Sequence, residues 1–431
     1  MISVLIGSLL VLAPAEAAAG DAARAAQVER LVRQLDSTQL TQRDAAERQL
    51  LELGASVLPA LPAIDQRTSA EVATRLARLQ QKLLRTQALA AAEPTLVTLK
   101  GDDLALSEVL ATISKQTGNP IVDHRPAFGE EQRESRIRVD FDKTPFWRAI
   151  DSVLDQAGLT LYGFTGQRGA FAVGRPPGAA PRAAQAYYAG MFRFEPLKFV
   201  AVRDLRNPSM ESLKFFMEVT WEPRMQPFAI MQPLAEVSVT VDGGQPLAVM
   251  GAEAEPESLV REGISTVELE IPLSLPKRDV KTIARLGGKL LVLMPGPLED
   301  FRFSELPLAA RNRPASRVEQ RKAGALVIVD HLRKNNDAWE VAVRVKFEGP
   351  SAALESHRSW ILENQAFFEQ ADGTRIEPAG IEQTVQNKEE TGINYFFDLK
   401  DGPKNLTFVY RTPIVVLELP VTYEFRDLPL P

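Results

Sequence analysis

The chain has 431 residues, and at roughly 100 to 200 residues per domain this length predicts about two to four domains. Its net charge is −6, with Lys and Arg mixed among Asp and Glu, so it offers no basic stripe for a nucleic-acid backbone. The absence of cysteine excludes disulfides, thiolate catalysis and cysteine-based metal sites, and three histidines, at 124, 331 and 357, argue against a histidine-rich metal centre.

The first residues have the pattern of an export signal. The stretch MISVLIGSLLVLAPAEAAAG is apolar from Ile2 to Leu12 and then passes into small residues, which is typical of a signal peptide and its cleavage site. No Lys or Arg precedes the apolar stretch, so residues 1–19 could instead be an uncleaved anchor. We expect an exported protein, periplasmic or associated with the cell envelope, that touches a membrane only if this segment is retained, because no later segment approaches 18 uninterrupted apolar residues.

Residues 22–92 are rich in the helix formers Ala, Leu, Arg, Gln and Glu, so they predict an all-helical segment. The stretch LVRQLDSTQLTQRDAAERQLLELGASVLPAL resembles HEAT-type repeats in its order of helix, acidic turn, Arg-containing second helix, Gly and next helix. A second helix pair is expected in SVLPALPAIDQRTSAEVATRLARLQQKLL. Two units are fewer than a free-standing solenoid requires, so we expect these helices to dock on another part of the chain or on a partner.

Residues 95–174 contain an internal repeat at a constant offset of 40 positions. Val97 matches Ile137 and Gly118 matches Gly158, and the apolar helix positions between them match in the same way. Each copy predicts a strand, an amphipathic helix with Gly just past its end, and a second strand. Such a βαβ-βαβ pair predicts a small α/β layer in which each helix covers a sheet face.

The two copies, VTLKGDDLALSEVLATISKQTGNPIV and RIRVDFDKTPFWRAIDSVLDQAGLTLYGFTGQRGAFAV, resemble the short N-terminal (STN) module of secretins and TonB-dependent receptors. The resemblance covers residues 95–174, and no outer-membrane barrel or secretin pore sequence follows them. It implies the same order of strands and helices, a periplasmic location and a role in contacts with other envelope or secretion-system proteins.

A linker is predicted at residues 175–186, which are rich in Pro, Gly and Ala without periodicity. Beyond it the pattern changes to β. WEVAVRVKF at 339–347 places alternating apolar side chains on one face, and SLKFFMEVTWEP, STVELEIPL and GGKLLVLMPG predict further strands. Turns are expected at residues 242–244, 335–337, 371–373 and 400–405.

One phrase occurs twice in this β region. FRFSELPL at 301–308 is a near copy of YEFRDLPLP at 423–431, and neither contains an obvious nucleophile or ligand set. We interpret the phrase as the terminal strand of each of two similar β-sandwich (Ig-like) domains, 187–309 and 310–431. The fold class predicted for the whole chain is therefore multidomain α+β, with N-terminal HEAT-like helices, a small βαβ-βαβ module and two C-terminal β-sandwiches.

No residue pattern predicts catalysis. ESHRSW and VDHL lack the Gly-x-Ser-x-Gly elbow of a serine nucleophile, so His331 and His357 are expected to be ordinary surface or interdomain histidines, and His124 to lie exposed in a loop. The sequence contains no Walker A, His-Glu-x-x-His or Gly-x-Gly-x-x-Gly motif. We therefore expect no catalytic residue, no metal site and no cofactor.

Acidic residues offer weaker candidates. They are the pairs Glu130-Glu131 and Glu389-Glu390 and the Asp-Gly turns at Asp242 and Asp372. The Glu pairs could serve acid–base hydrolysis only if they faced each other across a cleft, and their polar surroundings predict solvated charges instead. The Asp-Gly turns lack the alternating oxygen ligands of a calcium loop, so hairpin turns are expected there.

Aromatic residues concentrate in the β half. They are Trp221, Trp339 and Trp360 and the clusters Phe215-Phe216, Phe367-Phe368 and Tyr395-Phe396-Phe397. A row of exposed aromatics on a sandwich can stack on sugar rings. Because side chains alternate along a strand, one aromatic of each adjacent pair should point inward, and a core or domain interface is the favoured interpretation.

These patterns favour a non-catalytic exported scaffold or adaptor that binds envelope or secretion-system proteins through edge strands or complementary surfaces. The alternative is a carbohydrate- or polymer-binding envelope protein that uses the aromatics of one sandwich.

Overall fold

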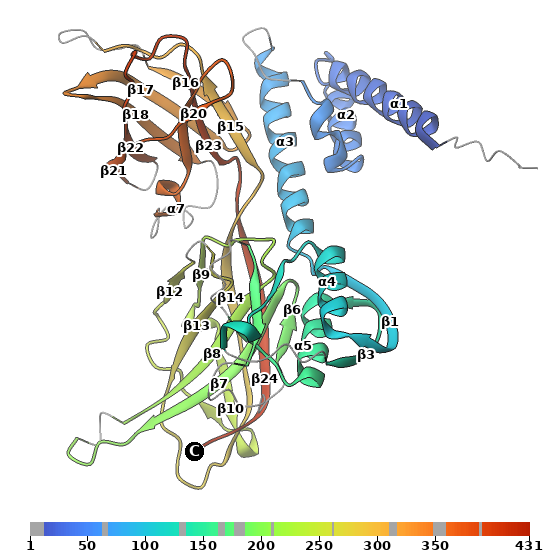
Figure 1. The fold of residues 1–431 in the computed structure, drawn as a ribbon, viewed down its shortest axis with the longest axis vertical. Coiled ribbons are helices and arrows are strands. Elements are labelled where there is room, and N and C mark those ends of the chain that lie inside the picture. The colour runs from blue at the N-terminus through green and yellow to red at the C-terminus, as the bar shows by residue number, and fades with distance from the viewer. Residues whose placement is uncertain are drawn as a thin grey trace, which may run out of the picture.

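The computed structural model describes residues 13–62, 68–128, 135–162, 169–175, 186–207, 211–260, 263–309, 317–347, 359–387 and 390–431. Figure 1 shows an elongated arrangement of N-terminal helices, an α/β module and two β-sandwiches. We call them the helical segment (13–91), the α/β module (96–174), sandwich 1 (187–295 with 416–429) and sandwich 2 (298–413). The sandwiches lie end to end, with the α/β module beside sandwich 1.

The helical segment consists of α1 (Ala13–Gln34), α2 (Leu40–Glu52), the 3-10 turn η1 (Ala55–Ala60) and α3 (Ala70–Ala91). Its apolar faces meet in a core of their own, in which Val28, Leu50 and Leu76 have no exposed surface. The buried Arg75 of α3 donates to Glu47 of α2 at 3.0 Å, so an ion pair also holds these two helices together.

The elements of the α/β module are β1 (Leu96–Ala105), α4 (Leu106–Thr117), β2 (Ile121–Asp123), η2 (Arg125–Phe128), β3 (Arg136–Pro145), α5 (Phe146–Ala157), β4 (Thr160–Tyr162) and β5 (Phe171–Gly174). The strand and helix of the second copy begin 40 positions after those of the first, at 136 against 96 and at 146 against 106. Each helix ends at a left-handed glycine, Gly118 (φ 68°) or Gly158 (φ 63°), a conformation that costs glycine little. The strands form two small sheets rather than one layer: β1 pairs with β3, and β5 lies between β2 and β4.

Sandwich 1 contains β6 (Tyr187–Ala189), β7 (Phe192–Val202), β8 (Ser212–Trp221), β9 (Ala229–Met231), η4 (Leu234–Glu236), β10 (Ser238–Val241), η5 (Asp242–Gly244), β11 (Pro246–Leu247), β12 (Glu257–Leu259), β13 (Thr266–Leu273), β14 (Thr282–Pro295) and β24 (Val416–Pro429). One sheet has the order β13-β8-β7-β6 and the other the order β11-β10-β14-β9-β12. The last strand, β24, pairs with β14 along its whole length, from Thr282 opposite Pro429 to Pro295 opposite Val416.

Sandwich 2 contains β15 (Leu298–Phe303), β16 (Val318–Lys322), β17 (Ala325–Asn335), β18 (Ala338–Phe347), α7 (Ser359–Leu362), β19 (Gln365–Glu369), β20 (Arg375–Ile376), β21 (Gly380–Gln386), β22 (Glu390–Phe397) and β23 (Thr407–Pro413). Its sheets have the orders β15-β23-β19-β20 and β16-β17-β18-β22-β21. The alternation predicted for residues 339–347 is confirmed for Val341, Val343 and Val345, which are buried on one face of β18, but Glu340 on the other face is buried as well.

The predicted boundaries 187–309 and 310–431 are corrected by two strand pairs: β15 pairs with β23, and β24 pairs with β14. The two copies of the repeated phrase do not close two consecutive sandwiches, because Phe301 lies in the first strand of sandwich 2 and Tyr423 in the last strand of sandwich 1. Sandwich 2 is therefore an insertion between β14 and β24. What the copies share is a pair of buried aromatics two residues apart, since Phe303 and Phe425 are buried as well.

The predicted fold class, multidomain α+β with HEAT-like helices, is wrong. Strands hold 47% of the residues and helices 25%, so the fold is β-rich with several sheets and is sandwich-like. The second helix pair does not form as predicted: the segment around Pro59 makes a 3-10 turn, and the single long helix α3 follows. Proline lacks the amide donor that an α-helix requires at such a position.

Two predicted segments lie largely outside the described residues. These are the signal peptide or anchor at 1–19, of which only 13–19 are described, within α1, and the linker at 175–186, of which 176–185 are not described. No helix within the described part of the chain is long and apolar enough to cross a membrane.

A buried carboxylate ties three parts of the molecule together. Glu222, which has no exposed surface, lies just after β8 of sandwich 1. It accepts hydrogen bonds from the amide and hydroxyl of Thr95 (2.9 and 2.8 Å), from Asn119 Nδ2 (3.0 Å) and from Arg224 Nε (2.8 Å). Arg224 also donates to the carbonyls of Ala91 and Glu93 at the end of α3.

A second buried ion pair joins α5 to sandwich 1. Arg193 Nε donates to both carboxylate oxygens of Asp151, at 3.1 and 2.9 Å, and both side chains are at most 5% exposed. Tyr188 donates to the same carboxylate, and Trp147 Nε1 donates to the carbonyl of Met191 at 2.9 Å. The α/β module is thus held by directional contacts, which fix its orientation on sandwich 1.

Candidate functional site

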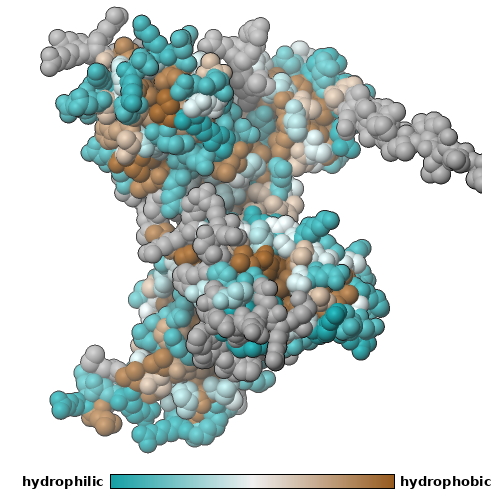
Figure 2. Space-filling view, in the orientation of Figure 1, coloured by the Kyte–Doolittle hydropathy of each residue, from teal (hydrophilic) through white to brown (hydrophobic). Residues whose placement is uncertain are grey.

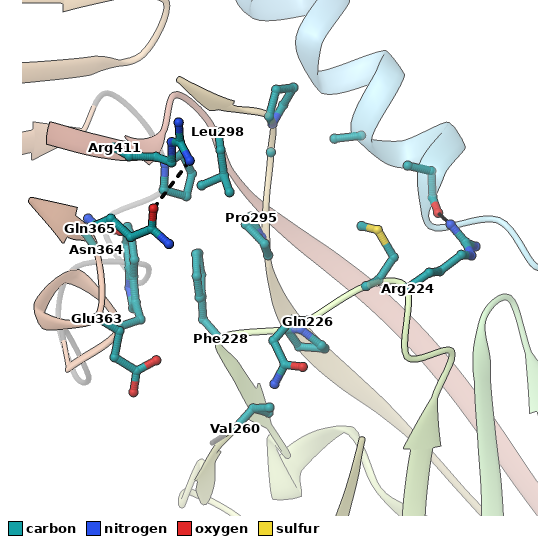
Figure 3. Close-up of a pocket in the computed structure, with 18 of the residues that line it drawn as sticks. Arg224, Gln226, Phe228, Val260, Pro295, Leu298, Glu363, Asn364, Gln365 and Arg411 are labelled. Atoms are coloured by element: carbon teal, nitrogen blue, oxygen red, sulfur yellow. Dashed lines mark hydrogen bonds between the residues drawn. The ribbon is translucent and has the colours of Figure 1, made fainter. Parts of the chain in front are cut away.

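A pocket of about 460 Å³ lies where sandwich 1, sandwich 2 and the end of α3 meet. Figure 3 shows Gln226, Phe228 and Val260 reaching it from sandwich 1, and Asn364 and Gln365 from sandwich 2. Ligand pockets in proteins commonly have volumes of about 300–1,000 Å³ and commonly form between domains. This junction is therefore the strongest candidate for a binding site.

The continuous ribbon that connects the sandwiches forms one wall. Beyond the β14–β24 ladder, the amide of Gly296 donates to the carbonyl of Val415 (2.8 Å) and the amide of Ile414 donates to the carbonyl of Pro297 (3.0 Å), after which β15 pairs with β23. A Cβ atom on Gly296 would lie 2.8 Å from the Val415 oxygen, so only glycine allows the strands to approach this closely. Pro295 and Pro297 flank this glycine and line the pocket.

A stacked aromatic pair forms the opposite side. The rings of Phe228 and Trp360 are nearly parallel, with centroids 4.1 Å apart, and Phe347 contacts the indole from another direction. Trp360 is only 6% exposed, and its Nε1 has no hydrogen-bond partner in the described part of the chain. The pair joins sandwich 1 to sandwich 2 and leaves an apolar surface inside the pocket.

Both arginines at the pocket are already neutralised. Arg411 donates to the two carboxylate oxygens of Asp300 at 2.5 and 3.0 Å, and these hydrogen bonds hold the pKa of Asp300 below its usual value, although partial burial opposes this. Arg224 is paired with Glu222 as described above. Neither cation is free to bind an anionic ligand, so a phosphate or carboxylate group gains little here.

Uncharged amides make up most of the remaining polar surface, which also includes the carboxylate of Glu363 (Figure 3). Asn364 donates to the hydroxyls of Tyr410 and Thr412, both at 2.9 Å, and Gln365 accepts a longer hydrogen bond from Arg411 (3.4 Å). Gln87 of α3 lies at the rim and is exposed. Apolar walls with amide groups at one side suit a ligand that is itself uncharged and carries amide groups.

The structure does not bring the predicted candidate histidines together. His331 lies on β17, where its Nε2 is 3.3 Å from Glu340, and His124 contacts the ring of Tyr162 at a centroid distance of 5.8 Å. His357 lies outside the described residues. Burial alone would raise the pKa of Glu340, but hydrogen bonds from Arg333, Asn335 and His331 outweigh it and lower the pKa.

The acidic candidates are equally scattered. Glu130, Glu131 and Glu389 lie outside the described residues, and Glu390 pairs with Arg344 and Lys346. The residues that the structure describes contain no group of three His, Asp or Glu side chains placed to hold a metal ion.

The two Asp-Gly turns are structural. Asp242 accepts from the amides of Lys281 and Thr282, and Asp372 accepts from the amide of Thr374 at 2.9 Å. Both lie in connections between antiparallel strands, as predicted for hairpin turns.

Most of the aromatics considered as a sugar platform are buried in the core. These are Trp221, Phe215, Phe367, Phe368, Tyr395 and Phe397, each at most 1% exposed. Phe216 is partly exposed, but the ammonium group of Lys198 covers its ring at 4.6 Å. Of the aromatics singled out in the sequence, only Trp360 lines the pocket.

Comparisons with known proteins find no match: no protein-family model matches the chain, and neither a curated protein nor a solved structure is significantly similar to it.

The pocket could not be predicted from local sequence patterns because its parts are far apart in the chain. The local signal that could have indicated it is Pro295-Gly296-Pro297 between two strand patterns, which marks a tight connection rather than the end of a domain.

Proposed function

We propose that this chain is an exported, non-catalytic adaptor of the cell envelope that binds an extended, uncharged segment of another protein in the pocket between the sandwiches. The observation that carries the proposal is the lining, which consists mainly of a stacked aromatic pair, prolines and neutral amides, with both nearby arginines paired with carboxylates and Glu363 as a lining carboxylate. Aromatic-lined grooves accept extended proline-rich or apolar segments, and amide side chains bind the backbone of such a segment.

The export signal at 1–19 and the STN-like pattern at 95–174 support the envelope part of this proposal, and they rest on the sequence alone. The buried contacts of Glu222 and Asp151 support the adaptor part, because they hold the α/β module and the helical segment in fixed positions on sandwich 1. A fixed frame can present several surfaces to partners at once without losing free energy to ordering on binding.

Site-specific photo-crosslinking tests the proposal. Because the chain has no cysteine, Gln365→Cys at the pocket rim and Ile381→Cys on the exposed strand β21 can each carry one crosslinker in an otherwise unchanged protein. In envelope fractions of the source cell, we expect the label at 365 to capture a discrete segment poor in charged residues, and the label at 381 to capture none.

A pocket-filling variant provides the matched control. Val260→Trp places a large ring in the pocket and should abolish the crosslink at 365 while thermal stability is kept. Equal labelling from both positions, or an undiminished crosslink in the Val260→Trp protein, would contradict the proposal. Binding on a glycan array that Val260→Trp leaves intact would favour the carbohydrate alternative instead.

A further inference from the structure

The end of sandwich 1 farthest from sandwich 2 exposes apolar side chains. The β7–β8 hairpin projects from this end, and apolar residues are visible on it (Figures 1 and 2). Leu205 is 91% exposed, and Val202, Leu197 and Val200 are 46%, 43% and 38% exposed. Large apolar side chains that cluster on a projecting element indicate a contact surface rather than chance exposure.

The backbone of the turn that contains Leu205 is held by side-chain hydrogen bonds. One carboxylate oxygen of Asp204 accepts from the amides of Arg206 (2.7 Å) and Asn207 (2.9 Å). These backbone hydrogen bonds lower the pKa of Asp204, so its carboxylate is charged at neutral pH and keeps both amides as donors. Leu205, between the acceptor and its donors, is therefore held away from the sandwich core.

Three basic residues lie at this end of sandwich 1, Arg206 directly after Leu205 and the other two beside Val202. Arg206, Lys277 and Arg278 form no ion pair in the described part of the chain, and two carboxylates of the same segments, Asp204 and Asp279, are also without an ionic partner, so cations outnumber carboxylates by three to two. Lys277 and Arg278 line a hollow of about 190 Å³ together with Val202. Free positive charge thus lies next to exposed apolar side chains, and we call this combined surface the distal tip.

We propose that the distal tip docks on an anionic lipid surface, with Leu205 and Val202 entering the interface and Arg206, Lys277 and Arg278 facing the lipid phosphates. Charge complementarity favours lipid over a second copy of the chain. A two-fold self-contact through this tip would bring the unpaired cations of both copies against each other, which is repulsive. A projecting tip also reaches a flat surface, where each basic residue adds attraction to anionic headgroups.

A polarity-sensitive fluorophore placed on a single cysteine tests this directly. The full chain with Leu205→Cys, labelled in this way, is mixed with vesicles of phosphatidylglycerol and phosphatidylcholine in equal parts, and Ile381→Cys serves as the matched control far from the tip. We expect emission at 205 to rise and shift to shorter wavelength, with no change at 381. The readout is local, so binding through residues 1–19 alone would not produce it.

Removal of the positive charges gives a second measure. Lys277→Gln combined with Arg278→Gln should weaken the vesicle affinity read at 205 roughly 30-fold, because each of the two basic residues contributes about 1 kcal/mol near an anionic membrane. Raising the salt concentration from about 0.1 M to about 1 M should reduce binding in the parent protein as well, since the Debye length falls from about 10 Å to about 3 Å.

Three results would overturn the proposal. One is emission at 205 that does not respond to the anionic vesicles at low salt. Another is an equal response to vesicles of pure phosphatidylcholine, which would remove the role of the cations. The third is a response to protein concentration alone, without vesicles, which would assign the distal tip to contact with a second copy.

Discussion

Replacing Glu222 tests whether one buried carboxylate holds the helical segment, the α/β module and sandwich 1 in fixed positions relative to one another. Glu222→Gln keeps the size of the side chain and removes its charge. One carboxylate oxygen accepts one of the four hydrogen bonds and the other accepts three, so the new amide nitrogen removes at least one of them, and Arg224 loses its ionic partner. Hydrogen bonds to charged groups contribute about 1.5–3 kcal/mol each and a broken buried ion pair costs about 3–5 kcal/mol, so we expect the junction to weaken by about 2–4 kcal/mol.

Hydrogen exchange at the amide of Thr95 measures this loss locally, because that amide donates directly to Glu222. At about 1.4 kcal/mol per tenfold change, its exchange rate should rise about 30- to 700-fold in Glu222→Gln. Glu268→Gln is the control: that carboxylate is exposed and its partner Lys198 is 3.5 Å away, so the free energy of unfolding should change by less than about 1 kcal/mol. An unchanged exchange rate at Thr95 in Glu222→Gln would show that apolar packing alone holds the junction.

Three further predictions concern sandwich 1. Removing residues 416–431 should unfold it, as seen by limited proteolysis, because β24 supplies the partner of β14; if sandwich 1 survives, the inserted topology is incorrect. Gly288→Ala places a Cβ 2.4 Å from the Tyr423 hydroxyl and should lower the free energy of unfolding in denaturant by about 1–3 kcal/mol, whereas Gly287→Ala, with its nearest contact at 3.4 Å, should lower it less. Burial raises the pKa of Glu218 despite the nearby Arg193, so the folded state binds this proton more tightly than the unfolded state and loses stability as pH rises above about 4.3. Glu218→Gln should therefore be more stable than the parent at pH 7, with a difference that disappears toward pH 4; a constant difference across this range would contradict the assignment.

Local patterns in the sequence predicted individual elements well. The 40-residue offset placed two strands and two helices, and the glycines after the helices are the left-handed caps that the pattern requires. The alternation at 339–347 predicted that Val341, Val343 and Val345 of β18 are buried, although it placed the buried Glu340 on the solvent face. These features depend on residues close together in the chain, and their hydrophobic period or turn chemistry is visible in any short window.

Long-range pairing could not be predicted in the same way. The pattern at 423–431 fits a final strand of sandwich 2 as well as one of sandwich 1. Alternating side chains predict that a segment is a strand, but they do not specify the strand with which it pairs. Only the ladder between Tyr423 and Gly288 decides between them, and those residues are 135 positions apart (423 against 288). The pocket was missed for the same reason, since its walls come from three parts of the chain.

The inserted topology makes sandwich 1 the centre of the molecule. Sandwich 2 is attached through both strands of one ribbon, so it cannot rotate about a single bond, and the stacked Phe228 and Trp360 oppose bending at the Gly296 crossing. The α/β module is attached by the Asp151 pair, whose separation would leave a buried charge without a partner. A partner segment in the pocket would therefore be held at a fixed position relative to the distal tip, so that docking of the tip on a lipid surface would set how far the pocket stands from that surface.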